Sequence, residues 1–508
     1  MKVKSESITR NVIANYFGRG WAALMALVFL PIYVASLGFE AYGLIGFFAV
    51  LQSMLAVFDF GITETLMRES ARHRTGVRSI QSLRDLVRSS ELIGAVSNTI
   101  LVLSVWALAE RLANDWVNVH QMKLESVAIS IALMGVVIAT RLQEGIYRGV
   151  LLGLGRQVII NVAFALFATA RYVGAIAILH YGSASIVAFF AWQVLMSVVS
   201  LIVLGTFANR YLPTSDRKPR FSLESLVSVW RFSAGMAVVA GLSIAMVNLD
   251  KLILSGVLAL DEFGRYALAA AAAGVLYLFV VPITQGFYPE MVGTYAAGDR
   301  EALIRLHHAS SQLVAAFAGS MAIVLSLFSE PILYVWSGNT ELASVISPIL
   351  AILAAVALVN CLGYIGHNLH VVSGTPSILA VTGAGAVLLT LVVLPTVTNK
   401  YGLPGGAFAW FGIAVLQAGI LLGLAHRGTL RGEGFRWLTI DTALPLLGAG
   451  VIAWLLSCFT PEPEVGGRFL LAIYLVVTAL VTIATATLIA PDLRVQVISF
   501  LHRRRATY

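Results

Sequence analysis

About fourteen apolar stretches, separated by short polar loops, run from Asn11 to Ala490. At roughly 18 to 25 residues, each stretch is long enough to cross the ~30 Å hydrocarbon core of a bilayer as an α-helix. Hydrophobic residues make up 58% of the chain and charged residues only 12%, and the mean hydropathy is +0.86. The sequence therefore predicts an all-α membrane protein with about fourteen transmembrane helices.

The expected spans fall into two groups on either side of a polar connection. We predict helices over 12–35, 43–67, 89–109, 124–147, 157–179, 185–207, 232–257, 266–289, 309–329, 346–371, 377–398, 405–424, 438–459 and 468–490. The connection contains proline and several charges, which are typical of a linker. We expect an N-terminal six-helix lobe over 1–208, a cytoplasmic linker over 209–231, a C-terminal six-helix lobe over 232–424, and two additional transmembrane helices with a basic tail over 425–508.

Three short motifs recur at a nearly constant offset and support this division. Glu40-Ala41-Tyr42-Gly43 matches Asp261-Glu262-Phe263-Gly264, Gly155 matches Gly374, and Tyr181-Gly182 matches Tyr401-Gly402. Each pair occupies equivalent loops of the two lobes. Because six spans precede the second copy, both copies would enter the membrane from the same side, so we expect a parallel repeat.

The basic residues are unevenly distributed along the chain. The net charge is +8, and about 25 of the 34 Lys and Arg residues fall on one side of the predicted membrane, the side that carries both termini. The positive-inside rule makes that side cytoplasmic. This excess of positive charge is expected to lie at the membrane surface, and no nucleic-acid partner is expected.

Motifs for catalysis or for cofactors are not found in the sequence. It contains no GxxxxGK[ST] phosphate loop and no GxSxG elbow. Every predicted outer loop is short, which argues against a hidden catalytic domain. Cys361 and Cys458 lie in different apolar runs, without the spacing of a zinc site or a disulfide framework. We expect neither an enzyme nor a cofactor.

Charges inside apolar runs are the candidate functional residues, because each costs roughly 2.5 to 3.5 kcal/mol at the bilayer centre. The deep cations exceed the deep unpaired acids, so a cavity that they line would attract an anion, such as a phosphate-bearing substrate. These cations are Arg19, Arg141, Arg171 and Lys251. Structural roles remain open: Arg19 can snorkel to the surface, Lys251 can pair with Asp250, and the helical spacing lets Glu144 pair with Arg141 or Arg148.

Acidic and polar residues within spans give a second set of candidates. Asp59 and Glu64 could couple transport to an ion, although Asp59 precedes Phe60-Gly61 and could instead cap or bend its helix. Glu64 could also pair with Arg68. A polar cavity face could be formed by Asn360, His367, Asn368 and His370. The histidine spacing resembles a metal site only weakly, so no metal is expected.

The sequence resembles Wzx-type polysaccharide flippases from its first span to about its tenth. The matching segments are Asn11-Val12-Ile13-Ala14-Asn15-Tyr16, Pro31-Ile32-Tyr33, Leu37-Gly38, Tyr42-Gly43-Leu44, Phe58-Asp59-Phe60-Gly61, Tyr147-Arg148-Gly149-Val150-Leu151-Leu152-Gly153, Arg156-Gln157, Asn161, Asp250-Lys251, Phe263-Gly264-Arg265-Tyr266 and Trp336-Ser337-Gly338. This family belongs to the multidrug, oligosaccharidyl-lipid and polysaccharide exporter superfamily, whose members have two six-helix lobes.

The resemblance implies a function and a location. Such a protein would export an undecaprenyl-pyrophosphate-linked oligosaccharide across the bacterial inner membrane, for O-antigen, capsule or exopolysaccharide. Its partners would be this anionic lipid-linked cargo, membrane lipids, and a polysaccharide polymerase and chain-length regulator. The two additional helices also fit a lipid II flippase. A drug/cation antiporter of the multidrug and toxin extrusion type would need acids in its cavity, and a membrane-embedded glycosyl transferase or polymerase would need a large outer loop.

Overall fold

The computed structural model describes residues 8–495 except 75 and 216. Within these residues the chain is helical, and the β-structure consists of an isolated parallel bridge between Asn118 and Ala259. Long helices follow from the sequence, because an apolar segment in lipid must satisfy its backbone N–H and C=O groups internally. The fold confirms the predicted all-α membrane class.

The chain divides into two compact units, Met1–Gly264 and Arg265–Tyr508. The first unit contains α1 (Ile8–Leu55), η1 (Ala56–Asp59), α2 (Ile62–Arg74), α3 (Ile80–Arg111), η2 (Leu112–Trp116), α4 (Leu124–Gly153), α5 (Gln157–Tyr181), α6 (Ile186–Tyr211), α7 (Leu223–Val227), α8 (Trp230–Val257) and the start of α9 (Leu260–Ala273). Because α8 packs on α1 and α2, it groups with the preceding helices. The lobe boundaries expected from the sequence stay a prediction.

The second unit contains the rest of α9 and all later helices. These are α10 (Leu276–Ala296), α11 (Arg300–Val314), η3 (Ala315–Gly319), α12 (Ser320–Leu327), α13 (Ser329–Ser337), α14 (Thr340–Val372), α15 (Pro376–Arg427), α16 (Gly434–Arg436), η4 (Trp437–Ala443), α17 (Leu444–Ser457) and α18 (Pro463–Ile489). Here η1 is a 3₁₀ turn, and η2, η3 and η4 are π-helical turns.

Eleven candidate spans are long and apolar enough to cross a membrane among the described residues. Two of them each cover a pair of spans expected from the sequence, because α1 bends at Gly38 and α15 bends at Gly402, both with positive φ. The expected span 232–257 corresponds to α8, which is not among the eleven. The count of fourteen therefore stays a prediction.

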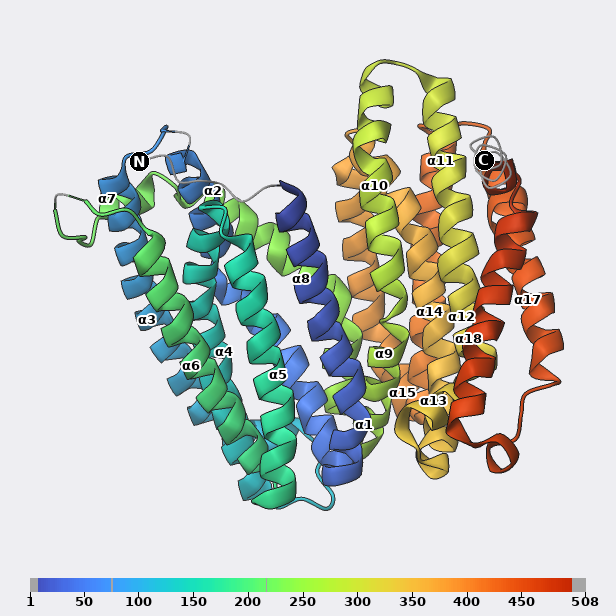
Figure 1. The fold of residues 1–508 in the computed structure, drawn as a ribbon, viewed down its shortest axis with the longest axis horizontal. Helices are drawn as coiled ribbons and strands as arrows, with labels where there is room; N and C mark the ends of the chain where they lie inside the picture. The colour runs from blue at the N-terminus through green and yellow to red at the C-terminus, as the bar shows by residue number, and fades with distance from the viewer. Residues whose placement is uncertain (1–7, 75, 216, 496–508) are drawn as a thin grey trace, which may run out of the picture. The chain divides into compact units, whose positions relative to one another are not determined.

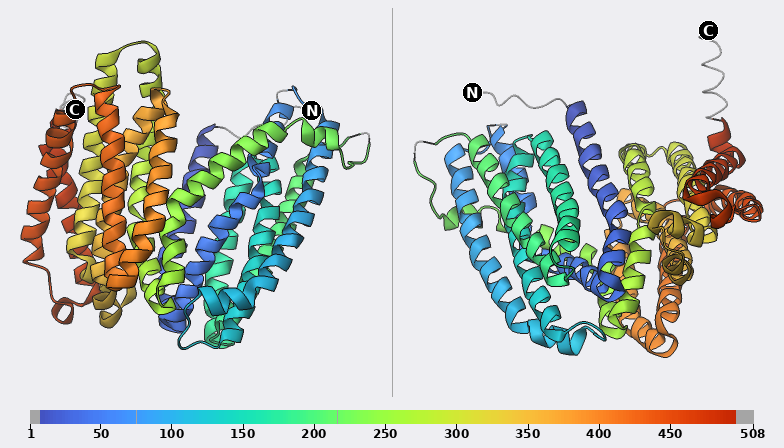
Figure 2. Two further views of the ribbon diagram at one scale, coloured as in Figure 1. Left: turned by 180° about the vertical axis from the view of Figure 1, so that it is seen from behind. Right: turned by 60° about the horizontal axis from the view of Figure 1, so that its bottom comes forward.

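In the first unit, α3, α4, α5 and α6 run side by side (Figures 1 and 2). Helix α4 packs against α2, α3 and α6, and its Ile131, Met134 and Ile138 are fully buried. Helix α3 has its apolar side outward, with Val96 62% exposed. An exposed apolar surface of this kind is what a lipid-facing helix presents.

In the second unit, α14 packs against α10, α12, α13 and α15. The two additional helices, α17 and α18, pack against the segment from η3 to α12 (Figure 1). Small side chains form this contact: Ala316, Ala449 and Ala486 are fully buried. Small residues let helix backbones approach closely in lipid, so α17 and α18 form an integral part of this unit.

One pair of repeat markers has the same local structure in both units. Gly155 follows α4 with φ +74°, and Gly374 follows α14 with φ +68°. In each case the next residue donates its N–H five residues back, Arg156 to Leu151 and Thr375 to His370, both at 2.9 Å. This is the Schellman C-cap, which needs a left-handed residue and therefore favours glycine.

Candidate functional site

Charged and polar side chains from four helices of the first unit meet within the apolar bundle. Arg141 and Glu144 are three residues apart on one face of α4, Arg171 lies on α5, Ser200 on α6 and Gln52 on α1. We call this group the arginine cluster. Two of the cations singled out in the sequence are therefore neighbours in the fold.

Arg141 is held by contacts with α1. Its Nη1 donates a hydrogen bond to Gln52 Oε1, and its guanidinium carbon lies 5.6 Å from the centroid of the Phe48 ring. The second contact is a cation–π interaction, which partly replaces the hydration that a buried cation loses. The Nε of Arg141 is buried and has no hydrogen-bond partner among the described residues.

Arg171 shares Glu144 with a hydroxyl group. Glu144 Oε2 accepts a hydrogen bond from Ser200 Oγ at 3.0 Å and lies 3.9 Å from Arg171 Nη2. The longer distance is an ion pair but not a hydrogen bond. Accordingly, both Nε and Nη2 of Arg171 are buried without a hydrogen-bond partner in the described part of the chain.

The arginine cluster thus contains two guanidinium groups and one carboxylate. The two arginines are near enough to repel each other, and each charge costs several kcal/mol in an apolar environment unless it is compensated. Glu144 compensates one of the two positive charges. The remaining charge and the unused N–H groups suit an anion with several acceptor oxygens, and phosphate groups have this chemistry.

Lys251, another of the predicted cations, contacts groups of its own helix. Lys251 Nζ lies 3.5 Å from Asp250 Oδ1 and 3.3 Å from the carbonyl oxygen of Val247, and both of these groups belong to α8. The side chain of Arg19 lies outside the described residues. A shared cavity for all four cations stays a prediction.

The acidic candidates of the first unit have different surroundings. Asp59 accepts hydrogen bonds from the backbone N–H and the hydroxyl of Thr63, at 3.2 Å and 2.7 Å. These contacts stabilise the first turn of α2, where Phe60 and Gly61 with positive φ interrupt the span expected over 43–67. Glu64 is half-buried, and among the described residues no ion pair joins it to Arg68, which instead lies 3.8 Å from Glu69.

The polar candidates of α14 do not share one environment. His370 is buried, with Nδ1 3.1 Å from Thr375 Oγ1 and Nε2 3.0 Å from the carbonyl oxygen of Leu421. His367 is exposed, Asn368 is half-buried, and Asn360 donates to the hydroxyl of Tyr277 at 3.1 Å. No group of three or more His, Cys, Asp or Glu side chains among the described residues could hold a metal ion.

A buried polar network in the second unit was missed by the sequence reasoning. His308 on α11 lies between Asp441 of η4 and Glu433, and its Nε2 is 3.0 Å from Glu433 Oε2. Gln312 donates to Asp441 at 2.7 Å and to Asp492 at 3.0 Å. A signal was present, because Asp441 lies in the apolar run predicted over 438–459, where an ionisable residue needs a partner.

Comparisons with known proteins agree with this architecture. The family model described as "Polysaccharide biosynthesis protein" matches residues 8–294. A protein of Shigella flexneri named "Putative O-antigen transporter" is 23% identical over 423 residues, covering 83% of this chain and 98% of the relative.

Two solved structures have a similar fold. The lipid II flippase MurJ in an inward closed conformation has a TM-score of 0.67 at 13% identity, covering 93% of this chain and 98% of that one. An inward-facing multidrug resistance transporter of the MATE family and MOP superfamily has a TM-score of 0.65 at 13% identity, covering 80% and 94%. The family match extends over more than half of the chain, so this protein belongs to the polysaccharide biosynthesis protein family.

Proposed function

We propose that this chain is a flippase that moves an undecaprenyl-pyrophosphate-linked oligosaccharide from the cytoplasmic to the outer leaflet by alternating access. The cargo would serve O-antigen, capsule or exopolysaccharide synthesis. The family match, the relative named as an O-antigen transporter and the fold of MOP-superfamily transporters support the function. The observation that carries the site is the arginine cluster, where buried guanidinium N–H groups of Arg141 and Arg171 lack hydrogen-bond partners among the described residues.

The chemistry of the cargo fits these groups. A pyrophosphate diester carries about two negative charges, and a guanidinium presents donors in a planar fork that matches phosphate oxygens. In an apolar bundle these charge-assisted hydrogen bonds are stronger than in water. Binding of the cargo would therefore compensate the positive charge that Glu144 leaves uncompensated. Release of the cargo would leave that charge uncompensated again, at a cost in free energy.

Lipid II is the second candidate cargo, because the MurJ fold covers 93% of this chain, whereas the MATE fold covers 80%. A drug/cation antiporter would need acidic side chains that are free to bind a cation, and two of the acids of the first unit described above are already engaged by other groups. Asp59 is engaged by Thr63, and Glu144 by Ser200 and Arg171. We retain Asp59 and Glu64 as proposed ion-coupling residues, and Arg19 and Lys251 as proposed additions to the cationic site.

The proposed setting is the bacterial inner membrane, with both termini in the cytoplasm. A polysaccharide polymerase and a chain-length regulator are the proposed protein partners, and the chain itself would not be an enzyme. In this orientation, reporter fusions after Lys218 and Arg431 should report the cytoplasm, and fusions after Asp115 and Asp261 the outside. The measurement is paired reporter activity in intact cells; a cytoplasmic signal at Asp261 would contradict the orientation.

Arg171 tests the proposed cargo site. Arg171→Ala alone would leave the buried carboxylate of Glu144 without its ion pair, so we expect the protein level to fall. The double variant Arg171→Ala/Glu144→Gln removes both charges and keeps a hydrogen-bonding group for Ser200. We expect this double variant to reach near-normal membrane levels and to lose polysaccharide export by at least about tenfold, equivalent to about 1.4 kcal/mol of lost binding.

Three further variants separate binding from folding. Glu144→Gln leaves two guanidinium groups without a carboxylate, so its protein level should fall, while export per protein molecule should be kept because both groups remain. Arg171→Lys should keep the protein level and part of the export, because a point charge replaces the planar fork. Arg148→Ala removes an exposed arginine from α4, the helix of Arg141 and Glu144, and should change neither protein level nor export. Normal export by a well-expressed Arg171→Ala/Glu144→Gln protein would refute the proposed site.

A further inference from the structure

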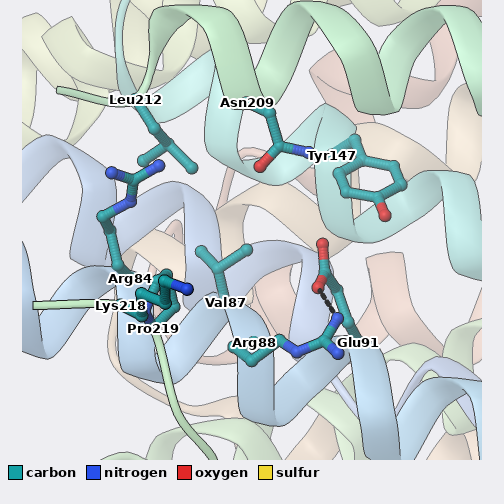
Figure 3. A pocket seen from close by; sticks show the side chains of 9 residues that line it. All are labelled: Arg84, Val87, Arg88, Glu91, Tyr147, Asn209, Leu212, Lys218 and Pro219. Atoms are coloured by element: carbon teal, nitrogen blue, oxygen red, sulfur yellow. Dashed lines mark hydrogen bonds and ion pairs between the residues drawn. The ribbon is translucent and has the colours of Figure 1, made fainter. Parts of the chain in front are cut away.

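A basic cavity of about 510 Å³ lies in the first unit between the ends of α3 and α6 (Figure 3). The charged residues that line it are Arg84, Arg88 and Glu91 of α3, and Lys218 of the linker. Three cations face one carboxylate, so the lining has an excess of two positive charges. This cavity is separate from the arginine cluster, with which it shares no residue.

Two of the cations are available for a ligand. Arg88 Nη1 is 3.1 Å from Glu91 Oε2, and this pair occupies one side of the opening (Figure 3). Arg84 and Lys218 lie at the other side, and neither side chain has a hydrogen bond or ion pair among the described residues. Uncompensated cations facing one cavity at a membrane surface attract anions.

The linker is fixed over this cavity by hydrogen bonds to α3. The backbone N–H of Arg220 donates to Asp85 Oδ1 at 2.9 Å, and that of Ser222 donates to Ser89 Oγ at 2.8 Å. Asp85 and Ser89 are buried, so these anchors are sheltered from water. These hydrogen bonds hold Lys218 and Pro219 at the edge of the cavity, so the fold fixes the position of this part of its wall.

Exposed apolar side chains lie next to the cavity. One turn from Arg88 on α3, the side chain of Leu92 is 39% exposed, and two turns from Asn209 on α6, that of Ile202 is 62% exposed. Acyl chains attached to a head group in the cavity would lie against these apolar surfaces. A free anion would gain nothing from them.

We propose that this cavity binds the head group of an anionic membrane lipid that carries two phosphate charges. Basic pockets between transmembrane helices at the cytoplasmic surface are suited to cardiolipin-type head groups. Two phosphates match the excess of two positive charges. The buried Val87 and Leu212 in the lining suit the glycerol carbons. The inference does not depend on the transported cargo.

The test uses the full chain in detergent and native mass spectrometry with added cardiolipin. Each cation is expected to contribute about fivefold to binding, so Arg84→Gln/Lys218→Gln should weaken cardiolipin retention about 25-fold. Arg210→Gln/Arg217→Gln is the control, because it removes two exposed cations, one near the end of α6 and one in the linker, that do not line the cavity. Its retention should equal that of the unchanged protein.

Two further arms identify the source of the phosphate groups. Phosphatidylethanolamine should bind all variants equally, and inorganic pyrophosphate at millimolar concentration should not displace cardiolipin. Arg84→Lys/Lys218→Arg should restore retention, and matching thermal midpoints show that the glutamine variant is folded. Equal cardiolipin retention by the glutamine variant and the unchanged protein would overturn the proposal. Pyrophosphate binding that depends on Arg84 and Lys218, without cardiolipin retention, would overturn the lipid assignment.

Discussion

Replacement of His308 by alanine is expected to lower the free energy of unfolding of the second unit by about 3 to 5 kcal/mol. His308 is 1% exposed, and both of its ring nitrogens contact carboxylates, Nδ1 with Asp441 and Nε2 with Glu433. Asp441 is fully buried. Removal of the ring would leave this carboxylate without its closest positive partner, and a buried unpaired charge is among the most destabilising changes known for a fold.

The number of hydrogen-bond donors available to His308, Asp441 and Glu433 determines how strongly these three groups interact. An ionised carboxylate can only accept hydrogen bonds, so two ionised neighbours require an imidazolium that donates from both nitrogens. Both hydrogen bonds then join oppositely charged groups, so both are charge-assisted.

Neighbouring groups extend this network to the C-terminal helices. Gln312 of α11 bridges Asp441 and Asp492, and its Oε1 accepts the backbone N–H of Asp492 at 2.9 Å. Arg436 Nη2 lies 3.9 Å from Asp492. On the other side, His307 contacts His426 at 3.1 Å. The network therefore connects α11 to η4 and to the segment that follows α18, beside the alanine contacts that hold α17 and α18.

Thermal unfolding in detergent checks this prediction. His308→Ala should lower the midpoint by at least about 6 °C, at roughly 2 °C per kcal/mol for a unit of this size. The exposed His180 gives a matched control, since His180→Ala removes the same side chain without burying a charge. His308→Ala/Asp441→Asn/Glu433→Gln should recover part of the loss. Equal midpoints for the His308 and His180 variants would show that the network contributes no stability.

The sequence alone predicted the class of fold and singled out the cations of the proposed site, because both follow from local chemistry. Apolar runs of sufficient length must be helical in lipid, and Arg141 and Arg171 are costly wherever the helices pack. The partner of Glu144 could not be predicted in this way. Helical spacing favoured Arg141 or Arg148, whereas the structure pairs Glu144 with Arg171 of the next helix.

Long-range pairing accounts for the rest of what the sequence could not predict. His308 and Asp441 are 133 residues apart, and Gln312 and Asp492 are 180 apart. No periodicity connects such positions, since their proximity depends on how α11 packs against η4 and α18. The break at Phe60 and Gly61 was recognised from the sequence only as an alternative to an ion-coupling role for Asp59, because the same apolar residues flank it as flank an unbroken helix.

Replacement of Gly43 by alanine is expected to prevent correct packing of the first unit, at a cost of at least about 3 kcal/mol. A Cβ atom on Gly43 would lie 2.0 Å from the carbonyl oxygen of Leu260. A substitution on the other side of this contact meets a similar obstacle, because a Cβ on Gly264 would lie 2.3 Å from the carbonyl oxygen of Phe39. Both obstacles are backbone atoms, which cannot move aside as a flexible side chain could.

This contact gives a physical reason for the repeated motif in the sequence. Tyr42-Gly43 and Phe263-Gly264 are the matching halves, and in the first unit they pack directly against each other. Tyr42 and Phe263 are buried beside the crossing. Each copy therefore needs an aromatic residue to fill the core and a glycine to let the other backbone approach.

The effect of these glycine substitutions is measured as the protein level in the membrane and as the fraction of the protein that stays folded after detergent extraction. Gly43→Ala and Gly264→Ala should each lower both, whereas Gly235→Ala should not, because a Cβ at Gly235 meets no atom within 4 Å and alanine favours the helix. Because a single separation of the two backbones relieves both overlaps, Gly43→Ala/Gly264→Ala should cost little more than either single change. Losses that add fully in the double variant would contradict a shared contact, and a normal level of Gly43→Ala would contradict the close approach itself.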